Sequence, residues 1–385
     1  MNLLMISGDR SVLQGRKGAF WHTLEELSKH WERIDVITPS PPARSTRFPP
    51  PPAGEGGRGE REFFGNVFFH PCPHGLWYQP RWIVRMGREL IAAHQHDVMT
   101  VHEYPPFYNG LGALRLSRKT RVPAVLEIHH IVGYPVAGSF TEWIGRILSR
   151  VWLPFATKKF AAVRTVNGEV KRVLARWGCP EDRITVVPSF YLDSALLQLD
   201  RSITKDYDVV FCGRLESNKG LPELLRAIAL LPKTRLLVIG DGSRRKYFEK
   251  DLANGLGITP RVRFAGWMAT PQEVAAAIQS AHIFVMNSKS EGGPRVALEA
   301  MALGMPVVAT RVGVMPEVID DGKNGLFTNG TAADLKAIIE RLLHDEPLCM
   351  QLGAEAQKIL PRFERAGAVA GYANFLQTVA SPSPS

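Results

Sequence analysis

The chain has 385 residues, which is too long for one ordinary hydrophobic core and predicts two domains. Hydrophobic residues make up 45% and charged residues 22%, a balance typical of globular proteins, and no apolar run is long enough to predict a membrane-spanning helix. The formal net charge is +10, and most of this surplus lies in the N-terminal half, so we expect an anionic partner there.

The cysteines and the N-terminal residues predict the cellular compartment of the protein. Four cysteines are scattered without the spacing of a metal or redox site, which indicates a reducing compartment. The N-terminus has no basic leader and turns polar too early for a signal peptide. We therefore expect a cytoplasmic protein. Its anionic partner is a phosphorylated substrate, an acidic bilayer or a nucleic acid, and the last is disfavoured because no nucleic-acid-binding module is recognisable.

The N-terminal half alternates apolar strand-like runs with amphipathic helices, as in a parallel sheet covered by helices. We predict strands at residues 2–7, 34–38, 63–70, 97–102, 124–129, 161–166 and 184–188. Helices are predicted at 20–31, 82–93, 142–156 and 169–177. The proline- and glycine-rich segment 39–59 is predicted to be an exposed loop.

The strand-poor segment 191–205 predicts a hinge, and the alternation restarts after it. We predict strands at 207–212, 235–239, 262–264, 282–286, 306–309 and 325–328, and helices at 221–231, 273–280 and 332–343. A last helix is predicted near 363–378, and a disordered tail at 381–385. The fold class is therefore α/β, with two doubly wound domains over residues 1–195 and 196–361.

One stretch of the second domain has the composition of a ligand site. The buried strand that ends near residue 286 is followed by Gly292 and Gly293, which let a ligand approach the backbone closely. Pro294 suits the first position of a new helix, whose N-terminal N–H groups attract anions. Glu291 precedes this helix and Glu299 lies within it, so the two carboxylates bracket a place for a diphosphate.

A second motif opens the same domain. A buried strand at 207–212 delivers Gly213 and Arg214 to a loop, and Lys219 stands at the start of the next helix. Two cations at the carboxyl end of a parallel strand, beside a helix N-terminus, favour bound phosphate. The turn with Gly240 and Gly242 follows the next strand, but it lacks the third glycine of a nicotinamide-binding fingerprint.

Together these motifs resemble retaining glycosyltransferases of the family-four type, the glycosyl transferases group 1. The spacing from Glu291 to Glu299 matches the Glu-x7-Glu signature of that family, and Gly213 to Gly220 matches its Gly-Arg-Leu-x3-Lys-Gly motif. The resemblance is specific over residues 208–330. It implies a GT-B fold, in which two Rossmann-like domains face each other across a cleft and the last helix, 362–380, crosses back to the first domain.

The resemblance also implies an activity. The enzyme would be of the hexosyltransferase type and move a sugar from a UDP or GDP sugar to a glycan, lipid-linked or small-molecule acceptor, with retention, in cell-envelope or polysaccharide biosynthesis. It would need no cofactor and no metal. The implied catalytic residues are Arg214, Lys219, Glu291 and His129. The implied donor-binding residues are Gly213, Gly240, Gly242, Trp267, Met268, Gly292, Gly293, Pro294, Arg295, Val296 and Glu299.

Several alternatives remain open at this stage. A nucleotide-sugar epimerase of the same architecture, or a non-catalytic nucleotide-sugar-binding protein, would share the second domain. The Asp206-Tyr207-Asp208 sequence resembles a metal motif, but it begins a strand and so lies at the wrong end of the sheet for ligand chemistry. His129 could be a packed histidine. The apolar and basic segment 143–160 is either a core-facing helix or one that rests on an anionic membrane surface, which would make the protein peripheral on the inner face of the membrane.

Overall fold

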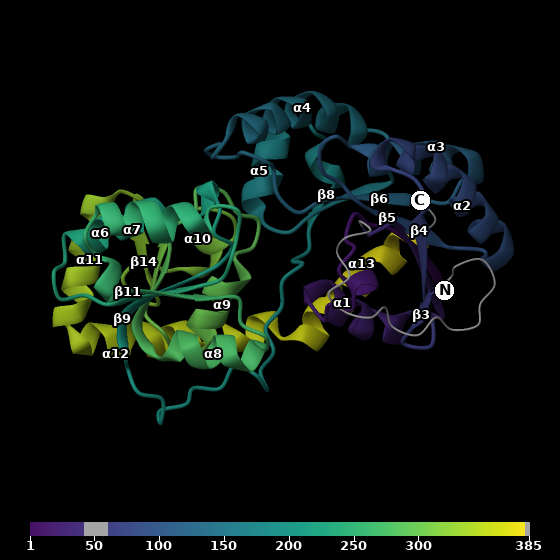
Figure 1. Ribbon diagram of the computed structural model, residues 1–385. Coiled ribbons are helices and arrows are strands. Elements are labelled where there is room, and N and C mark those ends of the chain that lie inside the picture. Colours follow the sequence, from purple (N-terminus) through teal and green to yellow (C-terminus); the bar gives the residue numbers. More distant parts are fainter. Residues whose placement is uncertain (42–60, 382–385) are drawn as a thin grey trace. The chain divides into compact units, whose positions relative to one another are not determined.

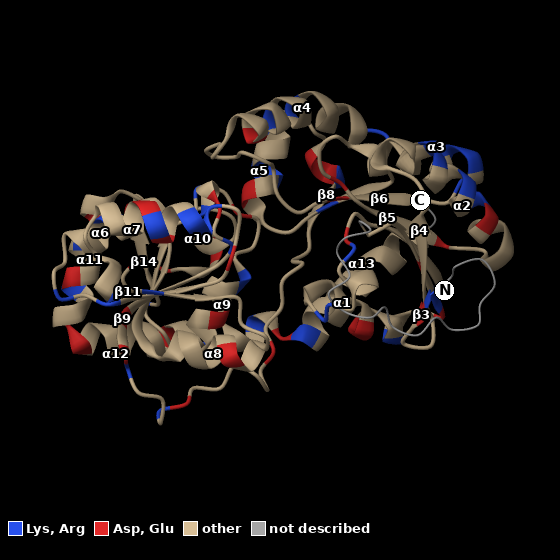
Figure 2. Cartoon of the chain, viewed as in Figure 1, with Lys and Arg blue, Asp and Glu red and all other residues tan. Residues whose placement is uncertain are grey.

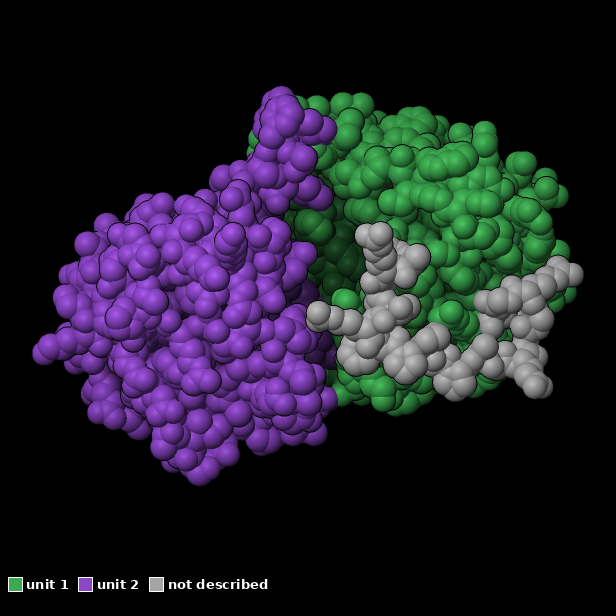
Figure 3. All heavy atoms as spheres, in the orientation of Figure 1, with its two compact units in different colours: residues 1–131, 145–189, 365–385 green, residues 132–144, 190–364 purple. Residues whose placement is uncertain are grey.

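The computed structural model describes residues 1–41 and 61–381, which form two compact units. Unit 1 comprises residues 1–131, 145–189 and 365–385, and unit 2 comprises residues 132–144 and 190–364 (Figure 3). The unit boundary therefore falls a few residues before position 195. The reason is local pairing: the backbone N–H of Leu192 donates to Phe363 O over 2.7 Å, so this segment packs with unit 2. Most of the predicted loop at 39–59 and of the tail lies outside the described residues.

Unit 1 is built on an eight-stranded sheet in the order β3-β4-β2-β1-β5-β6-β7-β8. Its ladders are parallel except where β3 runs antiparallel to β4. The central strands read as nearly continuous apolar runs because helices cover both faces of a parallel sheet. The strands are β1 (Asn2–Ile6), β2 (Arg33–Pro39), β3 (Arg61–Phe63), β4 (Val67–Cys72), β5 (Val98–His102), β6 (Ala124–Ile128), β7 (Ala162–Thr165) and β8 (Ile184–Val186).

The single strand expected at 63–70 is wrong, because β3 and β4 form a hairpin there. Phe64 and Gly65 have φ values of 55° and 79°, and this left-handed pair reverses the chain. Gly65 adopts such a φ without the steric cost that a side chain would add. The apolar run Phe63–Phe69 therefore serves two strands and the turn between them.

Two pairs of helices cover the unit 1 sheet. Helix α1 packs against α13, and α2 packs against α3 on the other face (Figure 1). Helix α13, at the end of the chain, thus belongs to unit 1. The helices are α1 (Ala19–Leu27), α2 (Gln79–His94), α3 (Tyr108–Thr120), α4 (Phe140–Ala156, which begins in unit 2), α5 (Gly168–Arg176) and α13 (Arg365–Ala380).

Sequence periodicity did not predict α3. Its two glycines, Gly110 and Gly112, lower helix propensity and conceal the pattern. The structure gives a packing reason for both. A Cβ on Gly110 would lie 1.7 Å from Oε2 of Glu103, and one on Gly112 would lie 2.8 Å from Cδ1 of Ile83. Close packing of α3 on its neighbours therefore outweighs the local propensity.

Unit 2 contains a six-stranded, fully parallel sheet in the order β11-β10-β9-β12-β13-β14. Helices α8, α9 and α12 pack together on one face, and α6 and α11 pack together on the other (Figure 1). The strands are β9 (Tyr207–Cys212), β10 (Leu236–Ile239), β11 (Val262–Gly266), β12 (Ala281–Met286), β13 (Val307–Thr310) and β14 (Leu326–Thr328). The helices are α6 (Leu221–Ala229), α7 (Ala253–Gly255), α8 (Pro271–Gln279), α9 (Arg295–Ala302), α10 (Met315–Val318), α11 (Ala332–His344) and α12 (Glu346–Gln357).

Candidate functional site

The strand order of unit 2 contains a topological switch point between β9 and β12. From β9 the chain continues outward to β10 and β11, whereas from β12 it continues to β13 and β14. The loops that leave the carboxyl ends of β9 and β12 diverge there, and open α/β sheets bind ligands in the resulting crevice. Arg214 lies in the first loop and Glu291 in the second.

Lys219 and Glu291 meet at this switch point. The ammonium of Lys219 forms a hydrogen-bonded ion pair with Oε1 of Glu291, although the two residues are 72 positions apart. The hydroxyl of Ser288 donates to the same oxygen over 2.8 Å. Both charged side chains are about 15% exposed, so each remains accessible to a ligand. The fold thus joins the two motifs that the sequence presents separately.

The loop that carries Glu291 is held by polar contacts that sequence reasoning missed. Nδ2 of Asn287 donates to the carbonyl oxygens of Gly220 and Gly330, at 3.0 and 3.1 Å. The hydroxyl of Thr310 donates to Ser288 O over 2.6 Å. Asn287 is buried, and it is the first polar residue after an apolar strand, which is the signal that could have identified it.

Helix α9 begins at Arg295, so the expectation that Pro294 is its first residue is wrong by one position. Pro294 is the N-cap instead, with φ −72° and ψ 79°. One turn further on, Nε of Arg295 donates to Oε1 of Glu299 over 2.8 Å. Burial raises the pKa of Glu299, and the Arg295 guanidinium opposes that shift. Gly293 has a packing reason as well, because a Cβ there would lie 2.2 Å from the ring of Phe190.

Most of the other residues predicted to bind the donor follow the carboxyl ends of β9, β10 and β11. Gly240 has φ 121°, and a Cβ on it would lie 2.0 Å from Gly213 O, so the loops after β9 and β10 touch. Arg214 is exposed. Trp267 is 79% exposed directly after β11, where an aromatic ring can stack on a base. Met268 beside it is half-buried, as is Val296 on α9.

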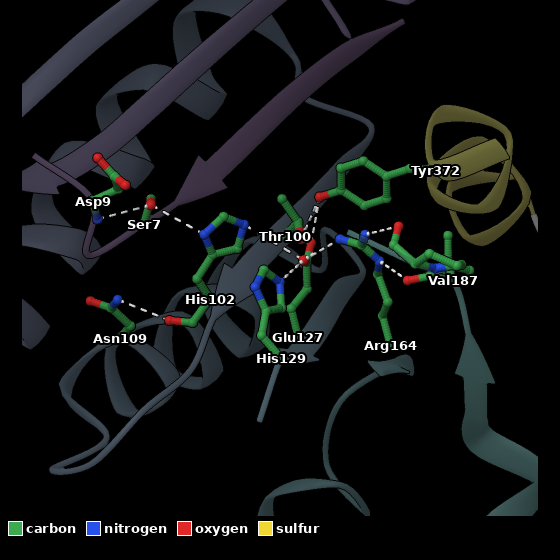
Figure 4. A network of polar contacts seen from close by, with 11 residues as sticks. Ser7, Asp9, Thr100, His102, Asn109, Glu127, His129, Arg164, Val187 and Tyr372 are labelled. Carbon is green, nitrogen blue, oxygen red and sulfur yellow. Dashed lines mark hydrogen bonds and ion pairs between the residues drawn. The ribbon is translucent and has the colours of Figure 1, made fainter. Parts of the chain in front are cut away.

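In unit 1, His129 directly follows β6 and joins a network of polar side chains (Figure 4). Its Nε2 lies 3.1 Å from Oε2 of the fully buried Glu127. Arg164, on the neighbouring strand β7, donates to the same oxygen over 2.6 Å. Tyr372 of α13 and Thr100 of β5 donate to the other carboxylate oxygen. Of these residues the sequence singled out only His129.

The electrostatics of this network favour an ionised Glu127. Burial by itself would raise the pKa of Glu127, but Arg164 and the two nearby histidines hold it well below its usual range. Burial lowers the pKa of His102 to about 4, against the attraction of Glu127. His102 is therefore neutral at pH 7.

Three side chains of this network, His102, Glu127 and His129, are also of the types that bind metal ions. Ligand atoms of His102, Glu127 and His129 lie within 4.8 Å of one another. The donor set does not fit a cation well, because Oε2 of Glu127 already accepts from the Arg164 guanidinium. A metal ion would lie against that positive charge. The Asp208 carboxylate is engaged as well, since it accepts the backbone N–H of Arg235 over 2.7 Å at the amino end of the unit 2 sheet.

Glu103 directly follows β5 and is buried. Its Oε2 accepts from the indole of Trp152 over 3.4 Å, and its Oε1 from the backbone N–H of Tyr104 over 3.2 Å. Burial raises the pKa of Glu103 to about 8, and these hydrogen bonds oppose the shift only in part. The carboxyl is therefore protonated at neutral pH.

We expect Glu103→Gln to become progressively more stable than the wild type between pH 5 and pH 8. Over this window the unfolded chain loses the Glu103 proton while the folded chain keeps it, so the free energy of unfolding of the wild type falls. One pKa unit corresponds to about 1.4 kcal/mol, which predicts a change of at least that size. Urea unfolding at both pH values measures it, with the exposed Glu62→Gln as control. A constant difference between wild type and Glu103→Gln would contradict this reading.

Comparisons with known proteins agree with this geometry. The model of Glycosyltransferase Family 4 matches residues 19–191, and that of Glycosyl transferases group 1 matches residues 200–359. The lipopolysaccharide core biosynthesis glycosyltransferase LpsE of Rhizobium meliloti is 35% identical over 46% of this chain and 52% of its own length. The sulfoquinovosyl transferase of Arabidopsis thaliana is 27% identical over 92% of this chain and 68% of its own length. The chain thus spans about half the length of the first of these relatives.

Two solved structures show the fold. Sucrose-phosphate synthase of Thermosynechococcus elongatus superposes with a TM-score of 0.81 at 18% identity, over 98% of this chain and 99% of that one. HepE of Anabaena, solved in complex with UDP-glucose, superposes with a TM-score of 0.74 at 20% identity, over 98% of this chain and 100% of that one. The architecture is that of the GT-B glycosyltransferases. The chain belongs to the glycosyl transferases group 1 of the family-four type, which confirms the resemblance carried by its two motifs.

Proposed function

We propose that this chain transfers a sugar from a UDP or GDP sugar to a glycan, lipid-linked or small-molecule acceptor, in cell-envelope or polysaccharide biosynthesis. The observation that carries the proposal is the Lys219–Glu291 pair at the switch point of unit 2, because a diphosphate sugar bound in that crevice would meet both a cation and a carboxylate. HepE binds UDP-glucose and LpsE takes part in lipopolysaccharide core biosynthesis, and these relationships support the donor and the pathway class.

The proposed reaction retains the anomeric configuration and uses no metal. Arg214 and Lys219 supply positive charge for the diphosphate as it leaves, and the N-terminus of α9 adds its dipole. The phosphate oxygen then accepts the acceptor's proton on the same face of the sugar. In this proposal Glu291 binds sugar hydroxyls and Glu299 binds the ribose.

A panel of nucleotide sugars tests the proposal. A bound donor raises the unfolding temperature by mass action, so one UDP or GDP sugar should stabilise the protein, and transfer should continue in EDTA. Stabilisation without transfer to any acceptor would make the chain a non-catalytic binder. A donor sugar recovered with altered stereochemistry would identify an epimerase. Loss of activity in EDTA that Mn²⁺ restores would contradict the metal-independent mechanism.

We further propose that the protein works in the cytoplasm, on an anionic membrane surface. None of the helices in the described ranges is long and apolar enough to cross a bilayer. Helix α4 buries one face, with Gly145, Ser149, Leu153 and Ala156, but exposes a stripe of large apolar side chains on another. The stripe consists of Phe140, Trp143, Ile144, Ile147, Leu148, Val151 and Phe155. The exposed cations Arg150, Lys158 and Lys159 flank it, as in helices that lie in a membrane interface.

A basic groove on α2 and α3 fits the same kind of partner. Figure 2 shows that Lys and Arg gather on α2 and α3. A groove of about 610 Å³ there is lined by Arg81, Arg85, Arg88, Arg115 and Lys119, with Glu89 as the single carboxylate of its lining. Trp152 of α4 stacks on Phe107, the N-cap of α3, so the apolar stripe and the groove belong to neighbouring helices. Acidic headgroups complement both in charge.

We expect the wild type to sediment with vesicles that contain phosphatidylglycerol but not with pure phosphatidylcholine. The double variant Ile147→Glu/Val151→Glu places two charges in the apolar stripe and should lower vesicle binding at least about tenfold, because buried apolar area drives interfacial binding. Leu230→Glu, a change at a 57% exposed leucine of unit 2, is the matched control. Equal sedimentation of the double variant and the control would reject this surface.

A further inference from the structure

The Glu127 network fixes the hydrogen-bonding role of His129. An ionised carboxylate can only accept hydrogen bonds, so the 3.1 Å contact requires Nε2 of His129 to carry a proton. Because Glu127 is ionised and has no proton to donate, the proton in this hydrogen bond must come from Nε2 of His129. When His129 is neutral, Nδ1 must then be the unprotonated nitrogen.

Glu127 is itself held in place by Thr100 of β5, Arg164 of β7 and Tyr372 of α13. Arg164 donates to it through Nη1, and its other guanidinium nitrogens donate to Val187 O at 3.0 Å and Pro188 O at 2.8 Å. Tyr372 donates from α13, and its ring lies 3.8 Å from the Arg164 guanidinium. A carboxylate bound so completely cannot rotate away from the histidine, so the orientation of the imidazole is fixed too.

His102 completes the arrangement on the other side. The backbone N–H of Asp9 donates to the Ser7 hydroxyl over 3.1 Å, which leaves the hydroxyl proton for Nδ1 of His102 at 3.2 Å. The protonated Nε2 of His102 then lies 3.5 Å from Oε2 of Glu127. The two imidazole rings lie side by side, with centroids 5.1 Å apart (Figure 4). Both histidines thus direct their Nε2 protons toward one carboxylate.

Nδ1 of His129 has no hydrogen-bond partner among the described residues, and its side chain is 37% exposed. We propose that Glu127 is a positioning residue that holds His129 as the Nε2-protonated tautomer, so that Nδ1 accepts a hydrogen bond from a hydroxyl of the bound sugar. The inference rests on the proposed function, because it assumes that His129 contacts substrate. In this arrangement Nδ1 of a neutral His129 has no proton, so it cannot donate a hydrogen bond to the sugar.

The first test needs no change to Glu127. Nitrogen-15 NMR of histidine-labelled protein at pH 8, with the His129 signals assigned by their loss in His129→Gln, reads the tautomer directly. We expect a protonated Nε2 and an unprotonated Nδ1. A protonated Nδ1 in the neutral ring would overturn the proposal. A shift of both ring signals on addition of stoichiometric Zn²⁺ would also overturn it, since the three residues would then form a metal site.

The second test separates positioning from structural support. Glu127→Gln should lose the fixed tautomer and lower kcat about 10- to 100-fold, as loss of a group that orients a histidine does, with the Kd of free UDP or GDP unchanged. Glu103→Gln, a change at another buried glutamate of unit 1, which directly follows β5, is the control. Tyr372→Phe removes a donor to the other carboxylate oxygen and should keep the wild-type tautomer.

The outcomes distinguish this inference from the proposed function. If the wild type neither binds nucleotide nor transfers sugar, the proposed function fails. If it does both and a folded Glu127→Gln variant retains the wild-type tautomer and kcat, the positioning role alone fails. If Glu127→Gln does not fold, the wild-type tautomer decides the question.

Discussion

We expect Arg214→Ala and Lys219→Ala each to lower turnover by about 10²–10³-fold, the usual loss when a donor that stabilises transition-state charge is removed. Both cations lie at the carboxyl end of β9 and at the turn that follows, where the leaving diphosphate would be held. The kcat of sugar transfer, measured with a saturating donor sugar, gives the size of the effect. Lys336→Ala, which breaks a helical Lys–Glu pair with Glu340 on α11, is the matched control.

The contact between Lys219 and Glu291 sharpens this prediction. Because the two side chains pair directly, the effects of Lys219→Ala and Glu291→Gln on turnover should not add in a double-mutant cycle. Arg214→Ala and Glu291→Gln share no hydrogen bond in the structure and should be closer to additive. Activity within a few-fold of the wild type in both single alanine variants would reject the proposal that Arg214 and Lys219 hold the leaving diphosphate.

The two glutamates should separate binding from transfer. Glu291→Gln should bind free UDP or GDP within a few-fold of the wild type but lose transfer by at least about 10²-fold, since its carboxylate is proposed to contact the sugar. Glu299→Gln should weaken nucleotide binding about 10- to 100-fold, because a hydrogen bond to a charged group contributes about 1.5–3 kcal/mol. Isothermal titration with free nucleotide and a turnover assay measure the two effects.

The control for both is Glu340→Gln, since Glu340 also pairs with a cation but lies on α11. Glu299→Gln removes the charge that Arg295 contacts, so its folding should be checked by the unfolding temperature. Nucleotide binding that is lost in Glu291→Gln and unchanged in Glu299→Gln would reverse the two assigned roles.

The sequence predicted unit 2 well because its motifs are local. Gly213 and Arg214, for example, directly follow β9, so a short window contains both the strand and the residues predicted to bind phosphate. The strands and helices of unit 2 were predicted for the same reason, because their hydrophobic patterns also lie within short windows of sequence. Helix α3 was missed because its glycines serve long-range packing, which no local pattern records.

The network in unit 1 could not be predicted in that way. Tyr372 and Glu127 are 245 positions apart, and only the folded chain brings them together. A signal was nevertheless present. Glu127 and Arg164 are each the one charged residue of their strand, and β6 and β7 pair them in register. Buried opposite charges on neighbouring strands indicate an ion pair, because neither charge is stable there alone.

The sequence periodicity of α4 predicted a helix but not whether its apolar stripe is buried or exposed. Its apolar and basic residues fit a core-facing helix and an interfacial helix equally well, because both need one apolar stripe. Only the structure shows that Phe140 and Val151 are exposed, at 72% and 73%. Exposure of that stripe depends on how the other elements pack around α4, and the sequence of the helix does not reveal it.

The anomeric configuration of the product tests the account most directly. The donor identified in the nucleotide-sugar panel is supplied with carbon-13 at its anomeric centre, and NMR follows that carbon from the donor into the first product formed. In the proposed mechanism Arg214 and Lys219 hold the leaving phosphate on the face where the acceptor attacks, so we expect a product with the donor's own configuration. An inverted anomeric centre in the initial product would contradict it.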